Sequence, residues 1–338
     1  MSEIRAGNKG LANLGNTCYM NSAIQCLSHL LTFHPLNETF QAQCVALTED
    51  CLMKEWYEFQ KKMWANEDDH MVNPLRLLQC FQRQCSENDF YFENFDQNDA
   101  DEFLTLFLDL IHKGITRKVL FRPSRIEDPL ITKAFDSWNK FYENDYSYII
   151  QNFHSQMLGI TTCPECDYYT TSHDPVQVIS LEIPKGASSL KDCLKSHTRL
   201  TELDGDNQWR CDQCHQLTKA KQRNLLWKTS DILIFLLKRY KNGKKITRFI
   251  DYDETFDVGP YSLNYSGDKG YRGEYSNTQY ALQGISVHDG SLGGGHYYAY
   301  CKNSLDQKWR QYNDTNVREI SAGEAMNSKG YVFFYKRL

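Results

Sequence analysis

Two Cys-x-x-Cys pairs constrain the fold of this 338-residue chain more than any other feature. The pairs are Cys163/Cys166 and Cys211/Cys214, and 44 residues lie between them. Four thiolates in this pattern are typical of a structural Zn²⁺ site, which would bring both segments to one point. A redox pair is the alternative, but two pairs in a strand-like region fit it poorly. The sequence therefore predicts a four-cysteine zinc ribbon whose two arms extend far before they meet.

The composition excludes several classes of protein. A net charge of −5 argues against general nucleic-acid binding, and we find no apolar stretch of about 18 residues that could span a membrane. Residues 1–9 lack the apolar region of a secretory signal. We therefore expect the twelve cysteines to be reduced, and the protein to be a cytoplasmic or nuclear monomer that binds neither nucleic acid nor membrane.

The texture of the sequence changes near its middle. From about residue 18 to 120, apolar residues recur at helical spacing, whereas from about residue 153 the chain has the short apolar runs of strands. The predicted strands are 176–183, 232–237, 280–287, 296–302 and 331–335. Residues 242–272, rich in Lys, Asp, Gly and Tyr, are predicted to form long surface loops. These features indicate an α+β fold with a helical lobe and a largely antiparallel sheet.

The segment from Gly10 to Ser22 combines features that thiol catalysis needs. Asn16 and Thr17 are natural helix caps and apolar residues follow at helical spacing, so Cys18 should open a helix. A thiol there would meet backbone N–H groups and the positive end of the helix dipole, which predicts a lowered pKa. Asn13 could stabilise an oxyanion through its side-chain amide. The alternative is that Cys18 is a buried small hydrophobe, as most free cysteines are.

A candidate base lies 278 residues downstream of Cys18. His296 follows the glycine run 293–295 and begins an aromatic strand, and Asn313 and Asp314 end the next predicted strand. Either of these side chains could orient the imidazole. The order Cys, His, Asn/Asp is that of papain-like proteases, with a large insertion between the cysteine and the histidine.

The window 86–102 contains seven acidic residues and no Lys or Arg. Such a charge run is usually a solvated face, and acids are favourable at a helix N-terminus. Asp99 and Glu102, however, are three residues apart at the start of a predicted helix and therefore share a face. Together they could bind an arginine-bearing peptide through charge-assisted hydrogen bonds.

These separated motifs resemble the catalytic core of the ubiquitin-specific proteases, the USP family of deubiquitinating cysteine peptidases. The resemblance runs in family order from about residue 9 to the end of the sequence. The matching segments are a Cys box at 10–22, an acidic motif at Gln97–Phe103, the four zinc-type cysteines, a strand at Leu236–Tyr240, and a His box at Gly295–Tyr300 with Tyr312–Asp314.

The resemblance assigns a role to each candidate residue. It implies that Cys18 is the nucleophile, His296 the general base and then acid, and Asn13 the oxyanion donor. Asn313 would orient His296, with Asp314 as the fallback partner. Because Asn313 carries no charge to stabilise an imidazolium, our hypothesis is that His296 depends partly on Asp314.

The resemblance also implies a papain-like right-hand architecture and an activity. A single catalytic domain over 1–338 would comprise a helical thumb (about 9–150), zinc-ribbon fingers (about 151–230) and an antiparallel β palm (about 231–338). Asp99 and Glu102 would contact arginines of the ubiquitin tail, and the loops 242–245 and 289–294 would gate its entry.

The implied reaction is hydrolysis after the C-terminal glycine of ubiquitin through an acyl-enzyme, with ubiquitin and ubiquitinated proteins as partners, structural zinc and no organic cofactor. A protease for another ubiquitin-like modifier and an inactive ubiquitin-binding scaffold are the alternatives. A general papain-like peptidase would have no need of zinc fingers.

Overall fold

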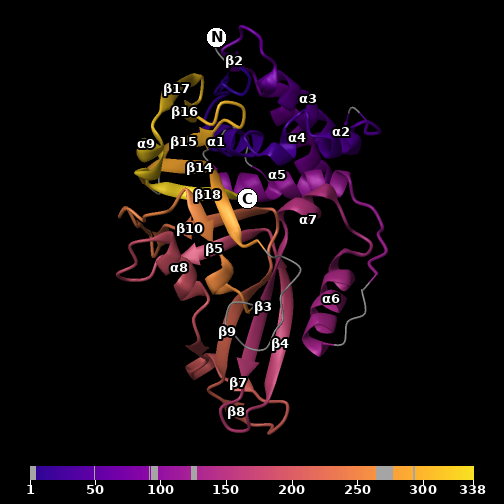
Figure 1. Ribbon diagram of the computed structural model, residues 1–338, viewed down its shortest axis with the longest axis vertical. Helices are drawn as coiled ribbons and strands as arrows, with labels where there is room; N and C mark the ends of the chain where they lie inside the picture. The colour runs from indigo at the N-terminus through magenta and orange to yellow at the C-terminus, as the bar shows by residue number, and fades with distance from the viewer. Residues whose placement is uncertain are drawn as a thin grey trace.

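The computed structural model describes residues 5–48, 50–90, 92, 98–122, 128–263, 277–291 and 294–338. Most of the helices gather at one end of an elongated molecule, and a narrow sheet projects to the opposite end (Figure 1). A larger sheet lies beside the helical end. Within these described ranges, every helix is too short or too polar to cross a lipid bilayer.

Helix α1 (Cys18–Ser28) is the centre of the helical end, and all of its residues are buried. Helix α5 packs against α1, and strands β14, β15 and β16 of the larger sheet also contact it. A helix buried on all sides must satisfy its polar side chains internally. Ser22 accordingly shares a hydrogen bond with Ser286 at 2.9 Å. The other helices of this end are α2 (Glu38–Cys44), α3 (Leu52–Trp64), α4 (Leu75–Glu87) and α5 (Ala100–Gly114).

The helical region continues beyond the predicted limit of about residue 120, through α6 (Pro129–Tyr142) and α7 (Tyr148–Phe153). Local signals explain both helices. Asp128 caps α6 by accepting hydrogen bonds from the first-turn amides, and Pro129 occupies the first helical position. Ser147 caps α7 in the same way. Helix α6 packs beside β4 of the narrow sheet.

The larger sheet has the strand order β17-β16-β15-β14-β18-β10-β5, and β13 also pairs with β14. All of these pairs are antiparallel except β10 with β5. Five of the strands match the predicted runs, because an apolar sequence suits strands that are covered by helices or loops on both faces. The strands are β5 (Val178–Glu182), β10 (Ile232–Lys238), β13 (Thr255–Asp257), β14 (Gln279–Ser291), β15 (Gly294–Lys302), β16 (Trp309–Asn313), β17 (Asn316–Ile320) and β18 (Gly330–Arg337).

The narrow sheet has the order β4-β3-β9-β6 and carries the cysteine pairs at its far end. Its strands are β3 (Ser155–Thr162), β4 (Tyr169–Val176), β6 (Thr201–Glu202) and β9 (Lys221–Lys228), and the small hairpin β7 (Trp209–Arg210) with β8 (Leu217–Thr218) lies at the tip. Between the cysteine pairs the chain returns to the larger sheet as β5, forms α8 (Leu190–His197), and comes back. The long spacing between the two cysteine pairs therefore contains β5 and α8 in addition to the extended strands of the narrow sheet.

The predicted loop region 242–272 contains more regular structure than expected. Strands β11 (Tyr240–Lys241) and β12 (Lys244–Lys245) form a hairpin, and β13 and a 3-10 turn at Gly259–Tyr261 follow. The Asn242-Gly243 turn has φ of 50° and 72°, the left-handed geometry typical of two-residue hairpins. This Asn-Gly signal was available in the sequence, so the hairpin could have been predicted, whereas most of 246–254 is irregular, as expected. Residues 264–276 lie outside the described ranges.

Candidate active site

Cys18 is the first residue of α1, as predicted, and its side chain is buried. Thr17 occupies the cap position, but its side chain does not cap the helix. Its hydroxyl instead accepts a hydrogen bond from the amide of Leu14 at 2.9 Å, which closes the turn before Cys18. The backbone N–H of Tyr297 is close enough to the thiol to lower its pKa. Because Tyr297 directly follows His296, the thiol lies beside the strand that carries the candidate base.

The environment of the thiol differs from the predicted one. Burial raises the pKa of Cys18, and the negative charge of Asp314 raises it further, while amides including that of Tyr297 act in the opposite direction. The effect of desolvation on the pKa is therefore larger than that of the helix terminus. Removing the thiolate from water costs more free energy than its interactions with a few N–H dipoles provide. The prediction of a lowered pKa was wrong for the protein without substrate.

His296 and Asn313 form the hydrogen bond that their predicted roles require. His296 Nε2 lies 2.6 Å from Asn313 Oδ1. The amide oxygen can only accept, so Nε2 carries a hydrogen and the other ring nitrogen, Nδ1, is unprotonated in the neutral imidazole. Their strands β15 and β16 are adjacent and antiparallel, which explains how residues 17 positions apart meet. This arrangement leaves Nδ1 able to accept a proton from a thiol.

Asp314 occupies a different place from Asn313. Its two carboxylate oxygens accept hydrogen bonds from Asn21 Nδ2 at 2.7 Å and from Asn13 Nδ2 at 2.9 Å. Asp314 has a φ of 49°, so the chain turns sharply after β16 and directs adjacent side chains to different partners. Sequence reasoning missed Asn21. A polar residue on the first turn of an otherwise buried helix was the signal that could have found it.

Asn13 joins the turn before Cys18 to the carboxylate of Asp314. Its side-chain oxygen accepts hydrogen bonds from the amides of Gly15 at 3.1 Å and Thr17 at 3.2 Å. This fixes the amide plane and directs Nδ2 toward Asp314. The backbone reinforces the arrangement, since the N–H of Leu11 donates to the carbonyl of Asp314 at 2.8 Å. The amide proposed for the oxyanion is therefore rigidly held next to a carboxylate.

The acidic pair Asp99 and Glu102 is divided between two environments. Asp99 caps α5 by accepting from the amide of Asp101 at 2.9 Å, and its other oxygen accepts from the Tyr331 hydroxyl at 2.8 Å. Glu102 is exposed and lines a cavity of about 560 Å³. The cavity lining, which we call the α5 cavity, is Phe90, Asp101, Glu102, Thr105, Leu106, Asp109, His112, His154 and Gln177.

The α5 cavity is acidic. Burial, together with the neighbouring charges of Asp99 and Glu102, raises the pKa of Asp101 to about 6. Carboxylates that destabilise one another's charge gain when a cation binds between them. Glu93, Asp96 and Gln97 of the predicted acidic motif, and Leu292 and Gly293 of the glycine loop, lie outside the described residues.

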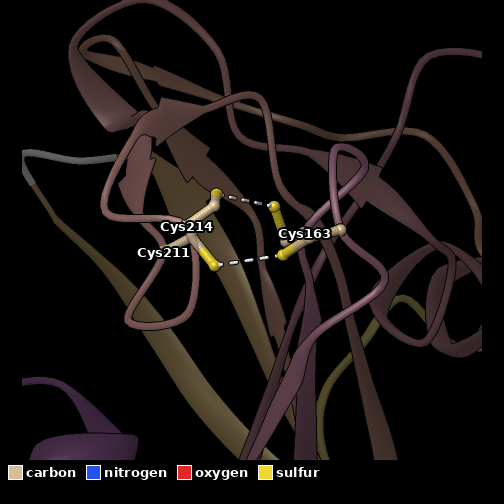
Figure 2. A group of neighbouring side chains, drawn as sticks. Cys163, Cys211 and Cys214 are labelled. Atoms are coloured by element: carbon tan, nitrogen blue, oxygen red, sulfur yellow. Dashed lines mark hydrogen bonds between the residues drawn. The ribbon is translucent and has the colours of Figure 1, made fainter.

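The four cysteines of the two pairs meet at the tip of the narrow sheet. Cys163 and Cys166 lie between β3 and β4, and Cys211 and Cys214 lie between β7 and β8. Figure 2 shows the side chains of Cys163, Cys211 and Cys214 directed toward one another. The Sγ separations are 3.9 Å for Cys163–Cys214 and 3.6 Å for Cys166–Cys211, and all four Sγ atoms lie within 4.8 Å of one another. Zinc–sulfur bonds of about 2.3 Å in a tetrahedron place sulfurs about 3.8 Å apart, so the cluster can hold a metal ion of this kind.

Comparison with known sequences gives relatives along nearly the whole chain. The chain is 31% identical over 352 residues to ubiquitin carboxyl-terminal hydrolase 2 of Gallus gallus, covering 99% of this chain and 95% of that protein. It is 30% identical over 340 residues to ubiquitin carboxyl-terminal hydrolase Usp2 of Drosophila melanogaster, covering 97% and 34%. The Bos taurus ubiquitin carboxyl-terminal hydrolase 2 is 29% identical over 357 residues, and this chain spans 56% of its length. This chain thus matches only part of two of these three proteins.

Solved structures share the fold. The SAGA Ubp8/Sgf11/Sus1/Sgf73 DUB module bound to ubiquitin aldehyde is similar with a TM-score of 0.77 and 25% identity, covering 100% of this chain and 71% of that chain. A structure of the module with monoubiquitin also gives a TM-score of 0.77, at 24% identity. The predicted α+β fold of the USP type is therefore confirmed. The family model for ubiquitin carboxyl-terminal hydrolases matches residues 9–335, and the chain belongs to this family.

Proposed function

We propose that the protein is a thiol-dependent ubiquitinyl hydrolase that cleaves the isopeptide or peptide bond after the C-terminal glycine of ubiquitin. One arrangement carries this proposal. The Cys18 thiol lies beside the backbone N–H of Tyr297, and the preceding residue, His296, is hydrogen-bonded through Nε2 to Asn313. A thiol, an imidazole with an unprotonated Nδ1 and an orienting amide are the parts of a cysteine protease. The relatives named as ubiquitin hydrolases and the ubiquitin-bound neighbours supply the substrate class.

The proposed reaction begins when His296 Nδ1 takes the proton of Cys18. The sulfur then attacks the carbonyl carbon of the terminal glycine, and the tetrahedral intermediate collapses when the amine leaves with the proton from Nδ1. Water, deprotonated by the same nitrogen, attacks the thioester, and the ubiquitin carboxylate departs as Cys18 regains its proton. The raised pKa of Cys18 makes the base essential, because little thiolate forms near neutral pH without it.

Asn13 and Asp314 are proposed to act together at the oxyanion. An amide NH₂ group has two hydrogens, and Asp314 engages one at 2.9 Å. The second can donate to the oxyanion, while the carboxylate holds the amide in place. The same carboxylate can stabilise the imidazolium that forms after proton transfer, which the neutral Asn313 cannot do.

We propose that the α5 cavity receives a basic segment of ubiquitin. Glu102 and Asp101 offer carboxylates in a partly enclosed space, and Phe90 and Leu106 offer apolar surface beside them. An arginine would form charge-assisted hydrogen bonds there. For Asp99 we propose an indirect contribution, because both of its oxygens already accept hydrogen bonds within the protein.

The cysteine cluster is proposed to bind one structural Zn²⁺. When bound, the ion would cross-link the β3–β4 turn to the β7–β8 hairpin through thiolates, and a site with four protein ligands has no open position for substrate. The division into thumb, fingers and palm stays a prediction, in which the narrow sheet forms the fingers.

Turnover of ubiquitin with a fluorogenic C-terminal amide tests the proposed activity. We expect hydrolysis by the wild type and none by Cys18→Ala, with the same substrate built on other ubiquitin-like modifiers turned over at least about 100-fold more slowly. Faster turnover of another modifier would show that this modifier, and not ubiquitin, is the substrate. Binding of ubiquitin without turnover would identify a scaffold.

A further inference from the structure

Strand β14 extends beyond the strand that covers one of its edges. It pairs with β18 up to Val287, which lies opposite Gly330, the first residue of β18. The last four residues of β14 continue to pair with β15 on the other edge. In that continuation Asp289 lies directly opposite His296. The residue of β14 that pairs with His296 therefore lies beyond the last residue pair of β14 with β18.

At this edge of β14, the side chain of Lys245 donates the hydrogen bonds that a neighbouring strand would otherwise supply. Its ammonium group donates to the carbonyl oxygens of His288 and Gly290, both at 2.9 Å. Residues two apart in a strand direct their carbonyls to the same side, so one ammonium can serve both. Lys245 is at the end of β12, in the hairpin with β11, and its Nζ also lies 3.0 Å from His288 Nδ1. Lys245 therefore attaches the hairpin to the end of β14.

The side chain of His288 contacts both Lys245 and the neighbouring strand β15. The Tyr240 hydroxyl also hydrogen-bonds to Nδ1, and with the ammonium group donating to the same atom, the ring proton lies on Nε2. The imidazole stacks on Tyr297 with ring centroids 4.5 Å apart. A Cβ atom on Gly295 would lie only 2.2 Å from Nε2, so the ring is seated directly against the strand. Gly295 and Tyr297 are the two neighbours of His296.

We propose that Lys245 is a positioning residue for catalysis, whose ammonium group holds the end of β14 and thereby fixes His296 relative to Cys18. The proposal rests on the proposed function, because it concerns the same base. Lys245 joins the hairpin of β11 and β12 to the last residues of β14. The two elements act as one unit, because a movement of β12 would break the bonds that align the end of β14.

The principal variant is Lys245→Met, which keeps the length of the side chain and removes the charge and donors. Lys241→Met is the matched control, since Lys241 lies in the same hairpin and pairs only at the surface with Glu182 at 3.5 Å. We expect Lys245→Met to lower kcat about tenfold or more, with KM within about twofold, because small misplacements of a catalytic group are costly. Lys245→Arg, which retains a cation and N–H donors, should recover most of the loss.

A spectroscopic measurement separates the proposal from the assigned activity. In the Cys18→Ala background, the NMR signal of His296 should shift with Lys245→Met and stay in place with Lys241→Met. The titration of His288 should also change, because burial and the charge of Lys245 lower its pKa to about 4. The other groups acting on His288 are Asp99, Asp289, His296, Tyr240 and Tyr297.

The outcomes discriminate clearly. A kcat loss with unchanged KM, arginine rescue and a shifted His296 signal would support the proposal. A Lys245→Met enzyme with kcat within twofold of Lys241→Met, or a loss explained by unfolding in a thermal melt, would overturn it. If the wild type hydrolyses no ubiquitin substrate, the proposed function fails, and the His296 signal still reports whether Lys245 positions the base.

Discussion

The candidate active site and the cysteine tip of the narrow sheet are held together in opposite ways. Around Cys18, a wholly buried helix, two strands and a network of side-chain amides fix the reacting groups. At the tip, two-residue strands and exposed side chains such as Leu217, 66% exposed, surround four cysteines. The first region has many redundant contacts, whereas the proposed metal ion would be the main cross-link of the second. A substitution that removes one contact near Cys18 should therefore lower the reaction rate. A substitution at the tip should instead lower the local structural order.

The largest effect is expected from the two residues after Tyr312. Asn313→Ala should lower kcat/KM about 100-fold, because it frees the ring that it fixes at 2.6 Å. Asp314→Ala should lower it about tenfold, by releasing Asn13 and Asn21 and removing a charge near the imidazolium. Steady-state kinetics on a ubiquitin amide measures both. Equal and mild losses would contradict the division of labour between these side chains.

The second prediction concerns the thiol of Cys18 in the free protein. Because burial raises its pKa, alkylation by iodoacetamide should be slow near neutral pH and should rise about tenfold per pH unit up to and beyond about pH 9. The sign follows from the chemistry, since only the thiolate reacts and a raised pKa shifts its formation to higher pH. The rate is measured by mass spectrometry of the Cys18 peptide. A plateau reached below about pH 7 would indicate a preformed ion pair with His296 and refute the desolvated thiol.

The third prediction concerns the four cysteines at the tip of the narrow sheet. Removing the metal with a chelator should expose the β3–β4 turn at 163–168 and the β7–β8 hairpin at 209–218 to proteolysis. It should also raise KM for ubiquitin about tenfold, because binding energy at such a site is folding energy. The contacts around Cys18 lie at the other end of the molecule, so kcat should change less than about twofold. Limited proteolysis and kinetics before and after re-addition of Zn²⁺ provide the readout. Loss of kcat with retained KM would show that the two ends are coupled and not separate.

The smallest effects are expected from the acidic pair. Glu102→Gln should raise KM about fivefold without changing the melting temperature, since an exposed carboxylate contributes about 1 kcal/mol to a charged contact. Asp99→Ala should lower the free energy of unfolding by about 1 kcal/mol, because it removes the cap of α5 and the bond to Tyr331. Kinetics and thermal melts on both variants separate these roles. A reversed pattern would restore Asp99 as the direct contact.

Features set by local sequence could be predicted. The start of α1 at Cys18, the apolar strand β10 and the cysteine pairs all follow from spacing, caps and ligand chemistry. Partners from distant segments could not, because they depend on tertiary placement. Asn21 meets Asp314 only after α1 packs against the sheet, and Tyr331 meets Asp99 across 232 positions of sequence.

The pKa of Cys18 shows the same limit. The helix terminus is visible in the sequence and favours the thiolate, whereas the burial that opposes it is a property of the folded protein. The hairpin of β11 and β12 was instead a missed signal, since Asn-Gly between short strands is readable without a structure.

Labelling by ubiquitin that carries a thiol-reactive group at its C-terminus would test most directly whether Cys18 is the nucleophile for ubiquitin. Intact mass should show one ubiquitin added to the wild type, and peptide mapping should place the bond on Cys18. Cys18→Ala should give no adduct although eleven other cysteines remain. An adduct on another cysteine, or none on a folded wild type, would contradict the assignment of Cys18.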